Sequence, residues 1–191
     1  FDTIAGSGPN GAIIHYKSNN LTNRKVKKND ILLIDSGGQY KWGTTDVTRT
    51  ICTRNVRGEI KNNFTRVLKG HIAVINCDLN KNYSGYLIDK LARKPLRDVG
   101  LDYSHGTGHG VGFFSNVHEG PISISRANSY ELKAGMVISN EPGYYGPKFG
   151  IRIENLELIR KVGKFLGFET LTLIPYERKL IDKNLLTKNE I

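Results

Sequence analysis

Strand-forming and helix-forming patterns occupy different parts of this chain of 191 residues. Stretches rich in apolar and β-branched residues lie in its first and last thirds, and they predict strands over 12–16, 31–34, 44–52, 136–145, 149–160 and 167–175. In the middle, apolar residues recur every three to four positions, which predicts an amphipathic helix over 59–77. A second helix is expected after the capping residue Ser84, and Pro95 should end or kink it. This order predicts an α+β domain with a mostly antiparallel sheet.

Composition and charge exclude several classes of protein. With 38% hydrophobic and 24% charged residues, the chain is predicted to be neither disordered nor a membrane protein. Its net charge of +10 could indicate a nucleic-acid partner, but the lysines are scattered and no RNA- or DNA-binding motif accompanies them. We therefore expect no nucleic acid and no membrane as partners. Cys52 and Cys77 are two isolated thiols in apolar surroundings, which favours a reducing compartment such as the cytoplasm.

Three of the five histidines, His105, His109 and His118, lie close together in a glycine-rich stretch. Glycine occupies every second position of 105–112, which disfavours a helix and suits a strand that something approaches closely. The stretch lacks the third glycine of a dinucleotide-binding loop and the lysine of a phosphate-binding loop. His71, alone on the predicted helix, is interpreted as a structural residue.

Asp35 and Asp46 are the first pair of candidate ligands. Asp35 ends an apolar run, where a carboxylate is costly without compensation. If the chain folds back between Tyr40 and Lys41, the two carboxylates face each other with Cβ atoms about 4.5–5.5 Å apart. A shared dication would remove their repulsion; the alternative is one aspartate in a turn and one on a solvated face.

Glu141 and Glu154 are the second pair. Glu141 precedes Pro142 at the end of a predicted strand. Strand alternation places Arg152 and Glu154 on one side of their strand. This pattern fits a structural ion pair, and equally an arginine beside a metal-bound carboxylate.

Together the candidates form a hard donor set of four carboxylates and one imidazole: Asp35, Asp46, His109, Glu141 and Glu154. Such a set suits Mn²⁺, Co²⁺, Fe²⁺ or Zn²⁺. Two dications balance the four negative charges, whereas a single dication leaves a buried excess, so the charges favour two metals about 3.5–4 Å apart.

Several segments carry a resemblance to a known family: 8–16, 33–37, 43–50, 105–112, 116–121, 140–145 and 149–155. In their order and joint presence, the chain resembles the aminopeptidase P (Xaa-Pro aminopeptidase) family of pita-bread metallopeptidases. The resemblance implies the pita-bread (creatinase/aminopeptidase) fold, a curved, mostly antiparallel sheet covered by helices. Residues 1–191 would be the catalytic domain, and the family's N-terminal domains and C-terminal tail would be absent, so we expect metal binding with weak or no turnover.

The resemblance also assigns the metal ligands. It implies that Asp35 binds one metal, that Asp46 and Glu154 bridge both metals, and that His109 and Glu141 complete the other. The family usually prefers Mn²⁺, with Zn²⁺ or Co²⁺ possible. The implied reaction is attack by a metal-bridging hydroxide on the peptide bond before proline, with Glu141 taking the proton of the water.

Further roles follow from the same resemblance. His15 and His118 would contact the substrate, His118 would also stabilise the oxyanion or shuttle a proton, and His105 would help form the proline pocket. Arg152 and Tyr145 would orient Asp35. A homodimer is implied as well.

Two alternatives remain. A prolidase of the same fold would cleave Xaa-Pro dipeptides through the same five ligands. A non-enzymatic pita-bread module would bind histones, RNA or other proteins, but such modules typically lose metal ligands.

Overall fold

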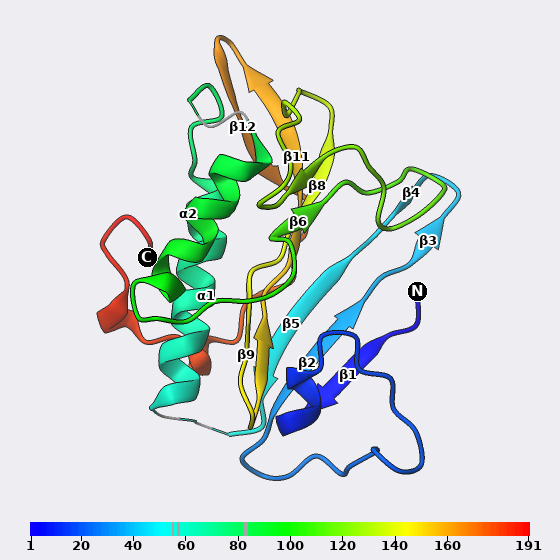
Figure 1. The fold of residues 1–191 in the computed structure, drawn as a ribbon, viewed down its shortest axis with the longest axis vertical. Helices are drawn as coiled ribbons and strands as arrows, with labels where there is room; N and C mark the ends of the chain where they lie inside the picture. The colour runs from blue at the N-terminus through cyan, green and yellow to red at the C-terminus, as the bar shows by residue number, and fades with distance from the viewer. Residues whose placement is uncertain (55, 57, 82–83) are drawn as a thin grey trace.

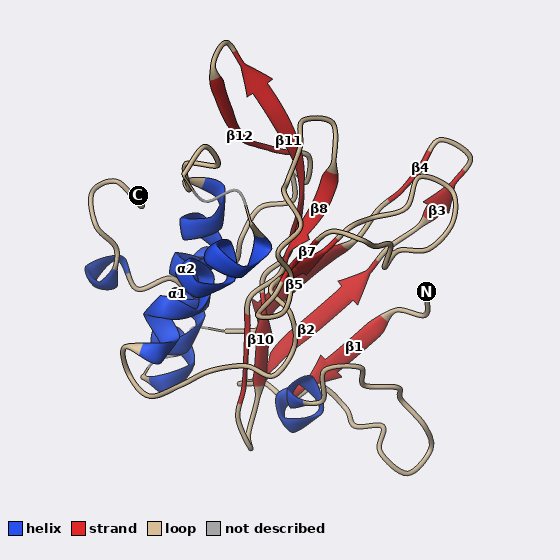
Figure 2. Ribbon diagram, turned by 45° about the horizontal axis from the view of Figure 1, so that its top comes forward, coloured by secondary structure: helices blue, strands red, loops and turns tan. Residues whose placement is uncertain are grey.

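Two helices cover one side of a set of antiparallel strands in the computed structural model, which describes residues 1–54, 56, 58–81 and 84–191. The helices, α1 (Glu59–Ile75) and α2 (Gly85–Arg97), pack against each other beside the strands (Figures 1 and 2). The strands are β1 (Ile4–Ser7), β2 (Ile31–Ser36), β3 (Gln39–Tyr40), β4 (Gly43–Thr44), β5 (Val47–Cys52), β6 (Gly108–His109), β7 (Ser123–Ile124), β8 (Val137–Asn140), β9 (Gly143–Tyr145), β10 (Gly150–Arg152), β11 (Asn155–Val162) and β12 (Phe165–Thr170). Short 3₁₀ helices lie at Gly8–Ala12, Arg178–Leu180 and Lys183–Leu185.

Every strand pairing among the described residues is antiparallel. Strands β1, β2 and β5 form one sheet in that order, and β12, β11 and β8 form another. The remaining strands make the pairs β3–β4, β6–β7 and β9–β10. The predicted α+β class with a mostly antiparallel arrangement is confirmed.

Several expected strands need correction where proline and glycine interrupt the chain. Residues 12–16 are not a strand: the Gly-Pro-Asn-Gly sequence that precedes them forms the 3₁₀ helix, followed by a turn. The expected strand over 136–145 divides into β8 and β9 at 141–142, because Pro142 cannot donate to a ladder. The expected strand over 149–160 divides into β10 and β11 at 153–154, and β12 ends at Thr170 rather than at residue 175.

Pro95 does not end the second helix. α2 continues to Arg97, although Pro95 cannot donate the hydrogen bond that an interior residue provides. The helix is held by its apolar face, because Ile88, Ala92 and Leu96 are almost fully buried. Tertiary packing therefore outweighs the local preference.

The core lies between the helices and the strands. On α1, Phe64, Val67 and Leu68 pack with Ile31 of β2 and Ile151 of β10 in one apolar cluster. A second cluster joins both helices to β7, β8 and β11. Within the described part of the chain, no helix is long and apolar enough to cross a membrane.

Two buried polar residues stand out in this core. His71 is fully buried, and its ring nitrogens contact the carbonyl oxygen of Asn140 and the hydroxyl of Tyr176, so its structural interpretation is confirmed. Glu157 on β11 is fully buried, and neither carboxylate oxygen has a hydrogen-bond partner among the described residues. Burial raises the pKa of Glu157 to about 7, although the nearby polar groups of Thr170, Asn140 and Asn155 lower it.

Glu157→Gln should make the protein more stable at neutral pH. The native carboxyl holds its proton up to about pH 7, whereas the unfolded carboxyl loses it near its ordinary pKa of 4.5, so stability falls as pH rises between these values. At pH 8 the gain from the amide should be about 3 kcal/mol, and at pH 4.5 it should vanish. Urea unfolding at both pH values tests this; an equal effect at both would contradict it.

Candidate metal centre

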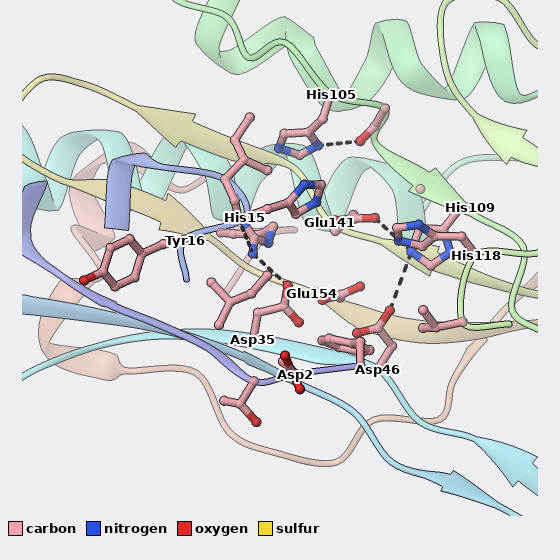
Figure 3. A pocket seen from close by; sticks show the side chains of 18 of the residues that line it. Asp2, His15, Tyr16, Asp35, Asp46, His105, His109, His118, Glu141 and Glu154 are labelled. Atoms are coloured by element: carbon pink, nitrogen blue, oxygen red, sulfur yellow. Dashed lines mark hydrogen bonds and ion pairs between the residues drawn. The ribbon is translucent and has the colours of Figure 1, made fainter. Parts of the chain in front are cut away.

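One cavity of about 870 Å³ collects the candidate residues from both ends of the chain (Figure 3). Its lining includes the five candidate ligands and the three histidines expected to contact substrate: Asp35, Asp46, His109, Glu141, Glu154, His15, His105 and His118. Arg152 also lines the cavity. Tyr145 is not part of the lining, but its hydroxyl accepts a hydrogen bond from Arg152. The structure thus brings together residues more than 100 positions apart in sequence.

Asp35 and Asp46 reach the cavity from one sheet, but not in the expected register. The chain reverses one position later than predicted, with Tyr40 opposite Gly43, so Asp35 of β2 faces Thr48 of β5. Asp46 is then the diagonal neighbour of Asp35, a relation that places Cα atoms about 7–8 Å apart. Both side chains still point to the same face because Asp46 and Thr48 are two residues apart.

The other donors come from strand ends and interruptions. His109 ends β6, whose close packing requires the predicted glycines: a Cβ at Gly108 would overlap the carbonyl oxygen of Ser139. Glu141 and Glu154 occupy the interruptions after β8 and β10. A short irregular segment lets each carboxylate turn into the cavity while neighbouring strands fix its backbone.

Ligating atoms converge at the centre of the cavity. One donor atom each from Asp46, His109 and Glu154 lies within 4.8 Å of the others. His109 Nε2 lies 3.5 Å from Asp46 Oδ2 and 3.2 Å from Glu141 Oε1. These distances are of the size that a shared cation spans between its ligands.

Unsatisfied oxygens support the same interpretation. Asp35 Oδ1 and Asp46 Oδ1 are buried and have no hydrogen-bond partner among the described residues. Leaving such oxygens unpaired is costly in a protein interior. Because hard oxygen and imidazole donors are also the ones that divalent first-row metals accept, the residues present fit a metal centre.

Mutual repulsion perturbs the carboxylates. Burial, followed by the charges of Asp35 and Glu141, raises the pKa of Asp46 to about 7. Burial and the same kind of repulsion raise the pKa of Glu154 well above its ordinary value. Burial would also raise the pKa of Glu141, but the hydrogen bond from His109 and its positive charge hold it below its ordinary value.

Arg152 links Asp35 to Tyr145 and, through the Tyr145 hydroxyl, to His105. Its guanidinium donates to Asp35 Oδ2 at 2.7 Å and to the Tyr145 hydroxyl at 2.7 Å. His105 Nδ1 lies 2.7 Å from the carbonyl oxygen of Gly106, which can only accept, so Nδ1 carries the ring proton and Nε2 accepts from the Tyr145 hydroxyl at 2.8 Å. The ion pair of Arg152 is with Asp35 and not with Glu154, the partner that one of the two interpretations of strand alternation gave it.

His15 and His118 lie at the exposed mouth of the cavity. The His118 ring lies 4.1 Å from the His109 ring, centroid to centroid. Burial and the neighbouring charge of His109 lower the pKa of His118. A neutral His118 at pH 7 offers one N–H donor toward a substrate in the cavity.

Sequence reasoning missed Thr48. Its hydroxyl donates to Glu154 Oε2 at 2.6 Å and accepts from Arg152 Nε at 3.1 Å, so it joins the two residues that lack a direct ion pair. The available signal was its spacing: Thr48 is two residues from Asp46 and therefore shares its face of the strand.

Sequence reasoning also missed Arg93, which holds the histidine segment against α2. The buried guanidinium donates to Asp89 Oδ2 at 2.7 Å and to the carbonyl oxygens of Tyr103 and His105, each at 2.6 Å. Thr107 donates to the other oxygen of Asp89 at 2.6 Å, and the carbonyl oxygen of Thr107 accepts from the Glu141 amide at 2.7 Å. α2 is thereby connected to both His105 and Glu141.

Comparison with known proteins identifies the family. The metallopeptidase family M24 model matches residues 1–161, and the model of the C-terminal region of peptidase M24 matches residues 164–191. The chain belongs to metallopeptidase family M24. As an M24 member it has the pita-bread fold expected from the resemblance, since it superimposes on solved M24 structures over nearly its whole length.

Relatives of this M24 chain include peptidases specific for proline. It is 51% identical to a probable Xaa-Pro aminopeptidase P of Laccaria bicolor and 50% identical to Xaa-Pro aminopeptidase 1 of Dictyostelium discoideum, in both cases over 100% of this chain and 32% of the relative. The X-prolyl aminopeptidase of Caenorhabditis elegans, described as a cytosolic enzyme with a di-nuclear active site, matches with a TM-score of 0.92 and 43% identity, over 100% of this chain and 32% of that one. The prolidase of Pyrococcus furiosus matches with a TM-score of 0.81 and 30% identity, over 92% and 50%. The chain therefore spans about a third of the length of these three aminopeptidases.

Arg93→Lys should destabilise the protein by about 3 kcal/mol, because an ammonium cannot reach the separate acceptors and leaves buried Asp89 unpaired. Arg97→Lys is the matched control on the same helix: Arg97 is exposed, and its pairing with Asp102 should contribute less than about 1 kcal/mol. Urea unfolding of both variants measures the difference. Similar losses would contradict the bracing role of Arg93.

Proposed function

We propose that residues 1–191 form the catalytic domain of a metal-dependent aminopeptidase that releases the N-terminal residue from peptides with proline in the second position. The observation that carries this proposal is the convergence of four carboxylates and His109 in one cavity. The 43–51% identity to Xaa-Pro aminopeptidases over the whole chain supports the choice of substrate.

The proposed ligand roles are those that the family resemblance implies. Asp46 and Glu154 would be shared between two metals, Asp35 would serve one of them, and His109 and Glu141 the other. The short distances of His109 to Asp46 and Glu141 support this division, as does the free oxygen of Asp35. Two divalent cations, Mn²⁺ by preference and Zn²⁺ or Co²⁺ as alternatives, would supply Lewis acidity toward the scissile carbonyl and a water of lowered pKa.

Protein groups supply the proton transfers. Glu141 is ionised at neutral pH, because its pKa is held low, and it can accept the proton of the attacking water. His118 lies beside His109 at the mouth, where its N–H can donate to the developing oxyanion. His15 also lines the cavity, apart from His118 (Figure 3), and it is in position to contact the peptide near the scissile bond.

Selection of proline follows from its chemistry. The nitrogen of an Xaa-Pro bond carries no hydrogen, so a site that requires that N–H rejects it, while a shaped pocket accepts the ring. His105 is fixed by Tyr145 and by the backbone of Gly106, so it can form a rigid wall of such a pocket.

The main alternative is a prolidase. The chain resembles prolidases in fold, but its identity to the Pyrococcus furiosus prolidase is 30%, against 43% to the Caenorhabditis elegans aminopeptidase. This difference favours the aminopeptidase. We also infer a cytoplasmic location, as for the cytosolic Caenorhabditis elegans enzyme. A homodimer is inferred from the family resemblance alone.

Metal stoichiometry combined with a substrate series tests the proposed function. Calorimetric titration of the metal-free chain should give two Mn²⁺ per chain. The loaded chain, whose turnover we expect to be weak, should cleave an Xaa-Pro-Xaa tripeptide at the first bond and leave the Xaa-Ala-Xaa control intact. Cleavage of the Xaa-Pro dipeptide in preference to the tripeptide would replace the proposal by the prolidase, and absence of metal binding by the folded chain would refute both enzymes.

Glu154→Gln should weaken metal binding but stabilise the metal-free protein. The amide removes one of the buried, mutually repelling charges, so the free energy of unfolding should rise by about 1–2 kcal/mol without metal, and stabilisation by added Mn²⁺ should be largely lost. Glu169→Gln, on an exposed ion pair with Arg160, is the control and should change neither quantity much. Thermal unfolding with and without Mn²⁺ measures both; a metal-free Glu154→Gln protein less stable than wild type would contradict the repulsion argument.

A further inference from the structure

The Tyr176 hydroxyl lies between two segments that carry candidate metal ligands. It accepts a hydrogen bond from Asn155 Nδ2 at 3.0 Å, and its oxygen lies 3.1 Å from His71 Nε2. Asn155 directly follows Glu154 in sequence. Tyr176 itself belongs to the C-terminal region, beyond β12, and does not line the cavity.

The hydrogen-bond directions in this cluster are determined by its acceptors. His71 Nδ1 lies 3.0 Å from the carbonyl oxygen of Asn140, which can only accept, so Nδ1 carries the proton. The ring is neutral, because burial and the charge of Arg49 lower the pKa of His71 to about 3. Nε2 must therefore accept, and the donor is the Tyr176 hydroxyl. The chain of bonds then runs from Asn155 through Tyr176 and His71 to the backbone of Asn140, the residue before Glu141.

Arg49 connects the same cluster to the C-terminal segment. Its guanidinium donates to Asn155 Oδ1 at 2.7 Å and to the carbonyl oxygen of Glu154 at 2.6 Å. It also donates to the carbonyl oxygen of Ile174 at 2.6 Å, and its central carbon lies 4.9 Å from the centre of the Tyr176 ring. The C-terminal segment is thus attached to the Glu154 segment at two points.

We propose that Tyr176 is a positioning residue for the metal centre, whose hydroxyl holds the segments bearing Glu141 and Glu154 at a fixed separation. The inference rests on the proposed function, because it takes these two glutamates as metal ligands. The physical need is clear: two like-charged side chains repel, and a ligand set must be held within about 0.5 Å of its working geometry. Hydrogen bonds to the backbone beside each ligand supply that restraint without occupying the cavity.

Tyr176→Phe tests the inference, since it keeps the ring beside Arg49 and removes only the hydroxyl. Mn²⁺ titration by calorimetry should show about tenfold weaker binding of at least one of the two metals. The kcat for tripeptide cleavage should fall while KM stays nearly constant, because substrate contacts are unchanged. Tyr144→Phe is the matched control: Tyr144 is buried, whereas Tyr176 is partly buried, and the Tyr144 hydroxyl donates to Glu59 on α1, away from the cavity.

The outcomes separate the inference from the proposed function. Two metals bound with wild-type affinity by folded Tyr176→Phe would overturn the positioning role, even with a lowered melting temperature, since loss of stability alone is what Tyr144→Phe should also show. Wild-type protein that binds no Mn²⁺ would overturn the proposed function and this inference with it.

A measurement on wild-type protein covers the case in which Tyr176→Phe does not fold. With ¹⁵N-labelled histidine, nuclear magnetic resonance should show His71 as the neutral Nδ1–H tautomer, and its signals should shift when diamagnetic Zn²⁺ is added, although His71 is not a ligand. An Nε2–H tautomer, or signals unmoved by saturating Zn²⁺, would overturn the inference.

Discussion

Repulsion among four carboxylates in one cavity is the constraint that organises this structure. Asp35, Asp46, Glu141 and Glu154 share one cavity, and among the described residues the positively charged partners of these carboxylates are Arg152 and His109. Burial, together with the excess of negative charge that the site carries without a cation, raises the pKa of Asp46 and Glu154. Such a cluster forms only if the rest of the fold holds the four side chains in place against their repulsion. The site therefore lowers the stability of the folded protein in exchange for its chemical function.

Three buried arginines contribute to that restraint, each from a different element of the fold. Arg152 donates hydrogen bonds to Asp35 and Tyr145. Arg93 on α2 donates to the backbone carbonyl of His105, and Arg49 donates to the backbone carbonyl of Glu154. A planar guanidinium can serve several acceptors at once, which makes arginine better suited than lysine to this task. The C-terminal Tyr176 joins the same system, so residues outside the cavity share in defining its shape.

The family relationship agrees with a scaffold that holds the candidate ligands separately from the groups that contact substrate. Aminopeptidases and prolidases among the solved structures share the fold of this chain, with TM-scores of 0.92 and 0.81 for the two compared above. A common scaffold and ligand set can serve more than one substrate, because substrate choice depends on the groups around the cavity mouth. In this chain we propose His15, His105 and His118 for that role, and hydrogen bonds hold both ring nitrogens of His105.

Local patterns were enough to predict α1, β2 and the five candidate ligands, because periodicity and residue chemistry are properties of short segments. The tertiary structure alone decided the register that sets Asp35 opposite Thr48, the continuation of α2 past Pro95, and the breaks that free Glu141 and Glu154. It also decided the contacts of Thr48, Arg93 and Tyr176, whose partners lie on other elements of the fold. These features depend on which distant segments pack together, and a linear pattern carries no information about the energy of contacts that form only after the chain has folded.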